Sequence, residues 1–178
     1  MGTPGTKSKP IPLAYLITFT CYGARLHGDE SGSVDRDHNL HGTPFLTPNP
    51  IRVRSEERRA KQVPYMLDRS RRAMVLEAVC ELCAHRGWTL LATHVRMQHV
   101  HFVVAAEDAP EKVLEDAKKY ASRALNRAGR EEQNQRRWTR HGSTRYLWKP
   151  ESVGAAIHYV VREQGEPMAV WEQPKGMG

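Results

Sequence analysis

Two histidines separated by a single residue, His99 and His101, are the side chains of this sequence best suited to chemistry. They lie in an apolar run that predicts a β-strand, and positions two apart in a strand point to the same face of the sheet. Two imidazoles on one face can supply half of the ligands of a metal site. The same spacing also fits ordinary strand alternation, with both histidines on a solvated face and Val100 in the core. The spacing alone leaves both interpretations open.

A second candidate for chemistry is Tyr159, in a helix predicted over residues 151–164 and ending at Gly165 and Pro167. Apolar residues at helical spacing form the buried face of this helix: Val153, Ala156, Ile157, Val160 and Val161. Tyr159 lies at the flank of that face, so packing does not require a tyrosine there. A phenol oxygen near a metal site and a basic surface suggests phosphodiester chemistry with a tyrosine nucleophile.

The charge of the chain favours nucleic acid as the partner. Lys and Arg number 27 against 20 Asp and Glu, a net charge of +7, which attracts polyanions. Basic residues around position 52 and a basic segment interleaved with aromatic residues over 129–149 have the composition of a single-strand binding surface. The residues proposed to contact DNA are Arg52, Arg54, Arg136, Arg137, Trp138, Arg140, Arg145, Trp148 and Lys149. An alternative for part of the second segment is a strand over 144–148 whose aromatic side chains pack in the core.

Other groupings that could bind a metal are better explained without one. Cys80 and Cys83 have the spacing of a zinc half-site, but they fall on the apolar stripe of a predicted helix, which favours core packing. Five loop residues could form a second site, although solvated side chains are the better interpretation: His27, Asp35, Asp37, His38 and His41. The three cysteines fit a reducing compartment. With no membrane-spanning run and no apolar signal segment, we expect a cytoplasmic, nucleoid-associated protein.

The elements that must position these residues follow from hydrophobic period and helix capping. The predicted order is a strand over 13–22, a helix over 68–87, strands over 88–95 and 99–106, a helix from 108, a strand over 144–148 and the helix over 151–164. Asp68 caps the first helix and Gly87 stops it, whereas Asp108, Pro110 and Glu111 form an acidic cap with a capping box for the second.

This order predicts an α+β fold of the ferredoxin-like type, an antiparallel sheet with helices packed on one face and a C-terminal helix that carries the tyrosine. A chain of 178 residues suits one such domain. We assign residues 11–172 to it, with a loop-rich insertion over 23–66 and flexible tails at 1–10 and 173–178.

The sequence resembles the single-tyrosine transposases of the insertion-sequence-200-like group, within the His-hydrophobic-His endonuclease superfamily, which includes transposases associated with repeated extragenic palindromes. The resemblance extends from residues 15–20 (YLITFT) to residues 164–167. Its most specific parts are residues 97–104 (MQHVHFVV), similar to the His-hydrophobic-His strand, and residues 156–167 (AIHYVVREQGEP), similar to the tyrosine helix. The resemblance implies that His99 and His101 are metal ligands and that Tyr159 is the nucleophile.

The sequence departs from its apparent relatives at one metal ligand. Similar members often carry a Gln four residues after the tyrosine, where this chain has Glu163, and Gln164 follows one residue later. On a continuous helix Glu163 lies one turn from Tyr159 on the same face, whereas Gln164 is rotated by about 140°. Helical geometry therefore favours Glu163 as the third ligand, with Gln164 as the alternative, and either fits Mg²⁺ or Mn²⁺.

The resemblance implies a reaction and a substrate. A divalent ion held by the histidines would polarise a phosphate oxygen while Tyr159 attacks, forming a 5′-phosphotyrosine link and a free 3′-hydroxyl. The substrate would be single-stranded DNA with a nearby hairpin, nicked and rejoined during transposition. Relatives include dimers that exchange the tyrosine helix and monomers that do not, so a homodimer is open. The competing hypotheses are a non-catalytic single-stranded DNA or RNA binding module on the same fold, and a hydrolytic nuclease.

Overall fold

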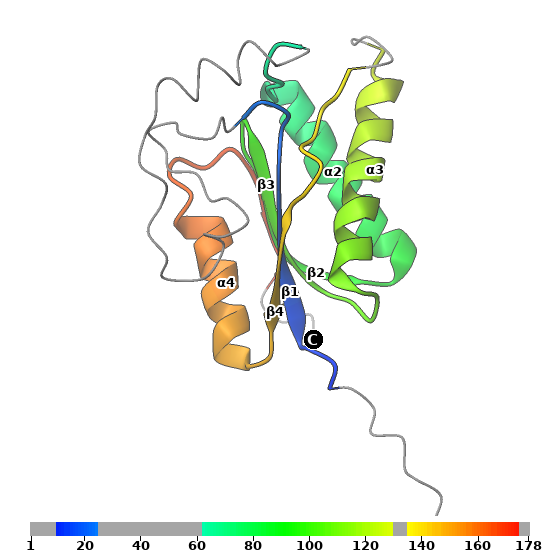
Figure 1. Ribbon diagram of the computed structural model, residues 1–178. Helices are drawn as coiled ribbons and strands as arrows, with labels where there is room; N and C mark the ends of the chain where they lie inside the picture. The colour runs from blue at the N-terminus through cyan, green and yellow to red at the C-terminus, as the bar shows by residue number, and fades with distance from the viewer. Residues whose placement is uncertain (1–9, 25–61, 130–134, 175–178) are drawn as a thin grey trace, which may run out of the picture.

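The computed structural model describes residues 10–24, 62–129 and 135–174 of the chain, which form one five-stranded antiparallel sheet with three helices (Figure 1). In chain order the elements are β1 (Ala14–Thr20), α2 (Arg69–Arg86), β2 (Thr89–Val95), β3 (His99–Ala105), α3 (Pro110–Arg127), β4 (Ser143–Leu147), α4 (Pro150–Arg162) and β5 (Ala169–Glu172). Every helix and strand predicted from the sequence is present. β5 was not predicted.

The strand order β4-β1-β3-β2-β5 confirms the ferredoxin-like α+β class. The first four strands have the order of a βαββαβ fold, and β5 extends the sheet by pairing with β2. β5 has only four residues and none of its side chains is fully buried, so it lacks the alternation that reveals a strand in a sequence. β2 and β3 form the predicted antiparallel hairpin, and in its register Val95 lies opposite Val100 and His94 opposite His101.

One face of the sheet is covered by α2 and α3, which lie together on one side of it (Figure 1). The strands alternate, so that every second residue of β1 and β3 enters this layer, including Ile17, Phe19, Val100, Phe102 and Val104. All five are fully buried. This layer is the larger apolar core of the molecule.

The opposite face is covered by α4 (Figure 1). The helix buries Ala156, Val160 and Val161 against a second, smaller cluster that includes Ala92 and Val103. The residues of β1 and β3 that alternate with the larger core point to this face. The sequence predicted the apolar stripe of α4 but not which face of the sheet would receive it.

The capping residues predicted for α2 are confirmed at both of its ends. The Asp68 side chain accepts a hydrogen bond from the backbone N–H of Arg71, and Gly87 ends the helix in the left-handed conformation at φ 70°. Cys83 is buried and Cys80 packs against the larger core, as predicted. Burial raises the pKa of the Cys83 thiol to about 12.

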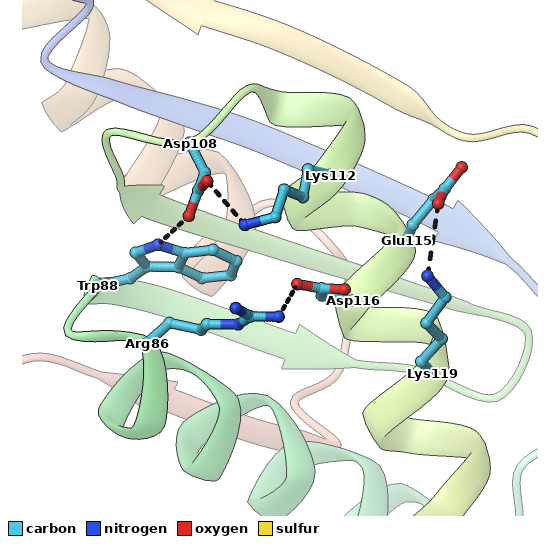
Figure 2. A network of polar contacts seen from close by, with 7 residues as sticks. All are labelled: Arg86, Trp88, Asp108, Lys112, Glu115, Asp116 and Lys119. Atoms are coloured by element: carbon cyan, nitrogen blue, oxygen red, sulfur yellow. Dashed lines mark hydrogen bonds and ion pairs between the residues drawn. The ribbon is translucent and has the colours of Figure 1, made fainter.

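The predicted acidic cap of α3 is wrong. Ala109 occupies the N-cap position without a side-chain hydrogen bond, and only Pro110 at the start of the helix is as predicted. Asp108 instead accepts hydrogen bonds from the Trp88 indole at 3.2 Å and from Lys112 at 2.7 Å (Figure 2). A partner brought close by the tertiary fold has replaced the local backbone partner that the sequence pattern favours.

Three further findings bear on the sequence predictions. No helix among the described residues combines the length and apolar character needed to cross a membrane. The proposed DNA contacts Arg52 and Arg54 lie outside the described residues. So do the five loop residues considered for a second metal site: His27, Asp35, Asp37, His38 and His41.

Candidate active site

His99 and His101 share one face of β3, the face that α4 covers. Their ring centroids lie 4.7 Å apart with the planes at 72°. His101 is 6% exposed, and His99 is partly buried nearer the end of the strand. The alternative interpretation, in which both histidines lie on a solvated face of the sheet, is therefore wrong. The structure places two imidazoles side by side under a helix.

Thr18 on the neighbouring strand β1 orients His101. The two residues are direct partners in the β1–β3 register, and the Thr18 hydroxyl oxygen lies 2.8 Å from Nδ1 of His101. Histidines that bind metals commonly use one ring nitrogen for such a bond, which directs the other nitrogen to the ion. This contact fits a role for Nε2 of His101 as a metal ligand. Thr18 was not predicted, because its partner lies 83 residues along the chain.

Tyr159 is brought to the histidine pair by α4. Its ring centroid lies 5.8 Å from that of His101 in an edge-on arrangement at 78°, and the residue is 39% exposed. The neighbouring Val160 and Val161 are buried against the sheet, so Tyr159 lies at the margin of the packed face, as its position on the helix predicted. The contact is made within one chain.

A third histidine, His94 on β2, lies beside His101 on the same face of the sheet. It is fully buried, directly opposite His101 in the β2–β3 register. The backbone N–H of Met168 donates to Nε2 at 3.2 Å, so Nδ1 carries the hydrogen and donates it to the carbonyl oxygen of Val160 at 3.0 Å. Burial lowers the pKa of His94, the bond to Val160 opposes this shift, and the charge of Arg96 adds to it. His94 was not predicted as a site residue, although the hairpin register alone would have placed it beside His101.

The two candidates for a third metal ligand lie just beyond the helix. α4 ends at Arg162, and Glu163 at its C-cap has φ −103° and ψ 11°, so the rotation expected on a continuous helix does not apply to Glu163 and Gln164. The Glu163 carboxylate lies 2.8 Å from Nδ1 of His158. Gln164 uses its amide nitrogen to donate to the carbonyl oxygen of Tyr159 at 3.2 Å.

The described residues contain no group of three or more His, Cys, Asp or Glu side chains that could hold a metal ion. Glu163 therefore does not join His99 and His101 in this structure. The histidine pair itself fits a divalent ion, because two imidazoles share a face and one of them is oriented by a hydroxyl group. A metal would bind the side-chain oxygen of Gln164, whereas the hydrogen bond to the Tyr159 carbonyl uses the side-chain nitrogen.

The structure divides the predicted DNA contacts into exposed and buried residues. Arg137 is 6% exposed and Trp138 is 9% exposed. The Trp138 ring packs edge-on against Phe19, and its indole nitrogen donates to Ser122 at 2.9 Å. These contacts correct the prediction for Arg137 and Trp138, which the fold uses in the interior. The other predicted contacts within the described residues are exposed: Arg136, Arg140, Arg145, Trp148 and Lys149.

The alternative interpretation of residues 144–148, that the aromatic side chains of this strand pack in the core, is wrong for both of its aromatic residues. Tyr146 is 45% exposed and Trp148 is 50% exposed, and their rings stack at 5.8 Å with an interplanar angle of 8°. Only Leu147 between them is buried. β4 is an edge strand of the sheet, so one side of it has no neighbour to cover these rings.

The segment over residues 139–141 is held beside the end of β1 that pairs with His99. The backbone N–H of Thr139 donates to the carbonyl oxygen of Thr20, which is the register partner of His99. Lys118 donates to the three carbonyl oxygens of Thr139, Arg140 and His141 at 2.9 to 3.3 Å. Burial lowers the pKa of Lys118. The exposed Arg140 therefore comes from a turn that is held close to the histidine pair.

The chain was compared with protein families, with solved structures and with curated proteins. The family described as "Transposase IS200 like" matches residues 58–160, more than half of the chain and including His99, His101 and Tyr159. The structure is similar to a solved structure of a REP-associated tyrosine transposase bound to a REP hairpin, with 10% identity, a TM-score of 0.47, and coverage of 91% of this chain and 72% of that chain. A search of curated proteins finds no significant match.

Proposed function

Since the chain belongs to the IS200-like transposase family, we propose that it nicks and rejoins single-stranded DNA with Tyr159 as the nucleophile. The observation that carries the proposal is the contact within one chain between the Tyr159 ring and His101, at 5.8 Å. The family match supports DNA transposition, and this contact supplies the residues for its chemistry. The proposed substrate is single-stranded DNA next to a hairpin.

The chemical step is a transesterification. The phenol oxygen of Tyr159 attacks the scissile phosphorus, a Tyr–O–P bond forms, and the bond from phosphorus to the 3′-oxygen breaks. The phenol loses a proton and the departing 3′-oxygen takes one up, so the products are a 5′-phosphotyrosine and a free 3′-hydroxyl. Because the number of phosphate ester bonds is unchanged, another 3′-hydroxyl can reverse the step and join strands without ATP.

We assign the histidine pair to a divalent cation, Mg²⁺ or Mn²⁺. His99 and His101 would hold it, with Gln164 or Glu163 as the third protein ligand. When bound, the ion would neutralise charge on a non-bridging phosphate oxygen. Thr18 supports this assignment, because its bond to Nδ1 of His101 directs the opposite ring nitrogen toward the proposed site.

The tyrosine acts on the site of its own chain. α4 is joined to β4 at its start and to β5 at its end, and these are the two opposite edges of the sheet. Exchange of α4 between two molecules would have to pull at least one edge strand away from the sheet. A homodimer is therefore not needed to assemble the site.

The test is a covalent adduct on a denaturing gel. Labelled single-stranded oligonucleotides taken from genomic repeats that flank the gene are incubated with protein and Mn²⁺ or EDTA. We expect a slowly migrating adduct with Mn²⁺ that is absent with EDTA and absent in Tyr159→Phe. An adduct that persists in Tyr159→Phe excludes Tyr159. Metal-dependent cutting without an adduct indicates a hydrolytic nuclease, and binding without cutting indicates a non-catalytic binding module.

A further inference from the structure

A buried side chain of the sheet, His94, is hydrogen-bonded to the C-terminal turn of α4, beside the apolar contacts of Val160 and Val161. The last four carbonyl groups of an α-helix have no partner within the helix. The Val160 carbonyl is one of these, and Val160 is fully buried, so water cannot satisfy it. Nδ1 of His94 lies 3.0 Å from this oxygen and caps it from the sheet. This hydrogen bond therefore fixes the backbone of the residue that directly follows Tyr159.

The other ring nitrogen of His94 reaches the chain beyond the helix. Nε2 accepts a hydrogen bond from the backbone N–H of Met168, the residue before β5. The ring thus connects β2 to both sides of the turn that follows Tyr159. It is also the register partner of His101, so the side chain that holds the turn and the side chain beneath the tyrosine ring come from paired positions on neighbouring strands.

Arg96, the residue directly after β2, supports the same turn. Its Nη1 donates to the carbonyl oxygen of Glu166 at 3.1 Å. Its guanidinium also lies beside Gly165, which adopts φ 76°, so the chain reverses in a conformation that favours glycine. His94 and Arg96 therefore hold three points of the segment from Val160 to Met168.

We propose that His94, supported by Arg96, is a positioning residue that fixes Tyr159 over His99 and His101. This inference rests on the proposed function, because it names what aligns the nucleophile. A helix whose last turn is capped from the sheet can neither slide nor rotate without breaking a buried hydrogen bond. His94 does not contact DNA or metal in this role, since both of its ring nitrogens are bonded to backbone.

The test separates the two ring nitrogens. In His94→Asn an amide N–H takes the approximate place of Nδ1 and can still donate to Val160, whereas in His94→Gln the polar group lies near Nε2 and the Val160 bond is lost. Adduct formation is measured under single-turnover conditions with saturating oligonucleotide and Mn²⁺. We expect a rate about 10²-fold lower in His94→Gln and less than about 10-fold lower in His94→Asn, because a displacement near 1 Å can cost about 10²-fold.

A second readout needs no DNA, metal or activity. 3-Fluorotyrosine placed at position 159 reports the contact with His101 through its ¹⁹F chemical shift. The shift should change in His94→Gln and remain close to wild type in His94→Asn. DNA affinity should be unchanged in both variants, because a positioning defect lowers the rate of the chemical step and leaves binding intact.

Thr93→Val is the matched control. Thr93 is the buried neighbour of His94 on the same strand but faces the other side of the sheet, and its hydroxyl has no hydrogen-bond partner within the described part of the chain. The substitution keeps the shape and should leave both readouts unchanged. If the His94 variants lower the folded fraction, Arg96→Ala tests the same turn without altering the core, and Arg96→Lys should restore the rate because it keeps a donor.

Several results would overturn the inference. It fails if His94→Gln reacts at the wild-type rate, if His94→Asn is as slow as His94→Gln, or if Arg96→Ala is unaffected where the His94 variants do not fold. If wild-type protein forms no adduct with any oligonucleotide, the proposed function fails. In that case the ¹⁹F comparison alone decides whether His94 positions Tyr159.

Discussion

The two faces of the sheet carry the same strands and serve different purposes. The face under α2 and α3 is lined almost entirely by apolar side chains, such as Ile17, Phe19 and Phe102. The face under α4 is apolar over only part of its length and then presents His101, Thr18 and other polar groups. Neighbouring residues of β3, such as His101 and Phe102, therefore lie on opposite faces of the sheet.

This difference shows how a small domain can keep a polar site without losing its stability. Two helices on one face bury enough apolar surface to hold the sheet together. The single helix on the other face can then be short and leave a margin where polar side chains meet. Substitutions on the first face should therefore affect folding, and substitutions on the second should affect chemistry.

The largest expected effect is on the polar face. His101→Ala should reduce adduct formation at least about 10²-fold, because even residues that only orient a metal ligand are worth 10- to 100-fold. Its effect on unfolding should stay near 1–2 kcal/mol, the usual cost of one lost hydrogen bond and its unpaired partner. The measurements are single-turnover rates and urea unfolding. A variant that is largely unfolded would contradict the division between the two faces.

Phe102→Ala is the matching change on the apolar face, one residue away. Phe102 is fully buried beneath α2 and α3, so its loss should lower the free energy of unfolding by about 3–5 kcal/mol. At a temperature where the variant is still folded, the rate of adduct formation per folded molecule should remain near wild type. A selective loss of activity with unchanged stability would mean that the two faces are not separable in this way.

Thr18→Val tests whether the polar face is arranged around His101. Replacing the hydroxyl with a methyl group keeps the side-chain shape and removes the hydrogen bond between Thr18 and Nδ1 of His101. We expect Mn²⁺ affinity to fall about 10- to 100-fold, as measured by calorimetry without DNA. Thr18→Ser keeps a hydroxyl and is the control that should bind metal nearly as well as wild type. Equal affinities for all three proteins would remove Thr18 from the site.

Thr93→Val is a change on the apolar face and has the smallest expected effect. The Thr93 hydroxyl is buried without a hydrogen-bond partner among the described residues, which costs free energy in the folded state. Replacing it with a methyl group should stabilise the protein by about 1 kcal/mol. Thermal unfolding measures the change. A clear destabilisation would show that this face contains a polar contact that the apolar description omits.

The features that depend only on neighbours in the chain could be read from the sequence. The period of two placed His99 and His101 on one face, and the period of 3.6 placed Tyr159 beside the buried stripe of its helix. Asp68 and Gly87 marked the ends of α2, because capping uses groups a few residues apart. The ferredoxin-like class followed from the order of these elements.

Only the tertiary structure decided which groups meet across the fold. It placed α4 on the face opposite α2 and α3, brought Thr18 to His101, and made His94 the cap of the tyrosine helix. It also buried Trp138 and gave Asp108 partners other than the helix start. The reason is physical: apart from the bond between Asp108 and Lys112, these contacts join residues on different elements, and no local pattern records which polar partner a folded backbone will bring within hydrogen-bonding distance.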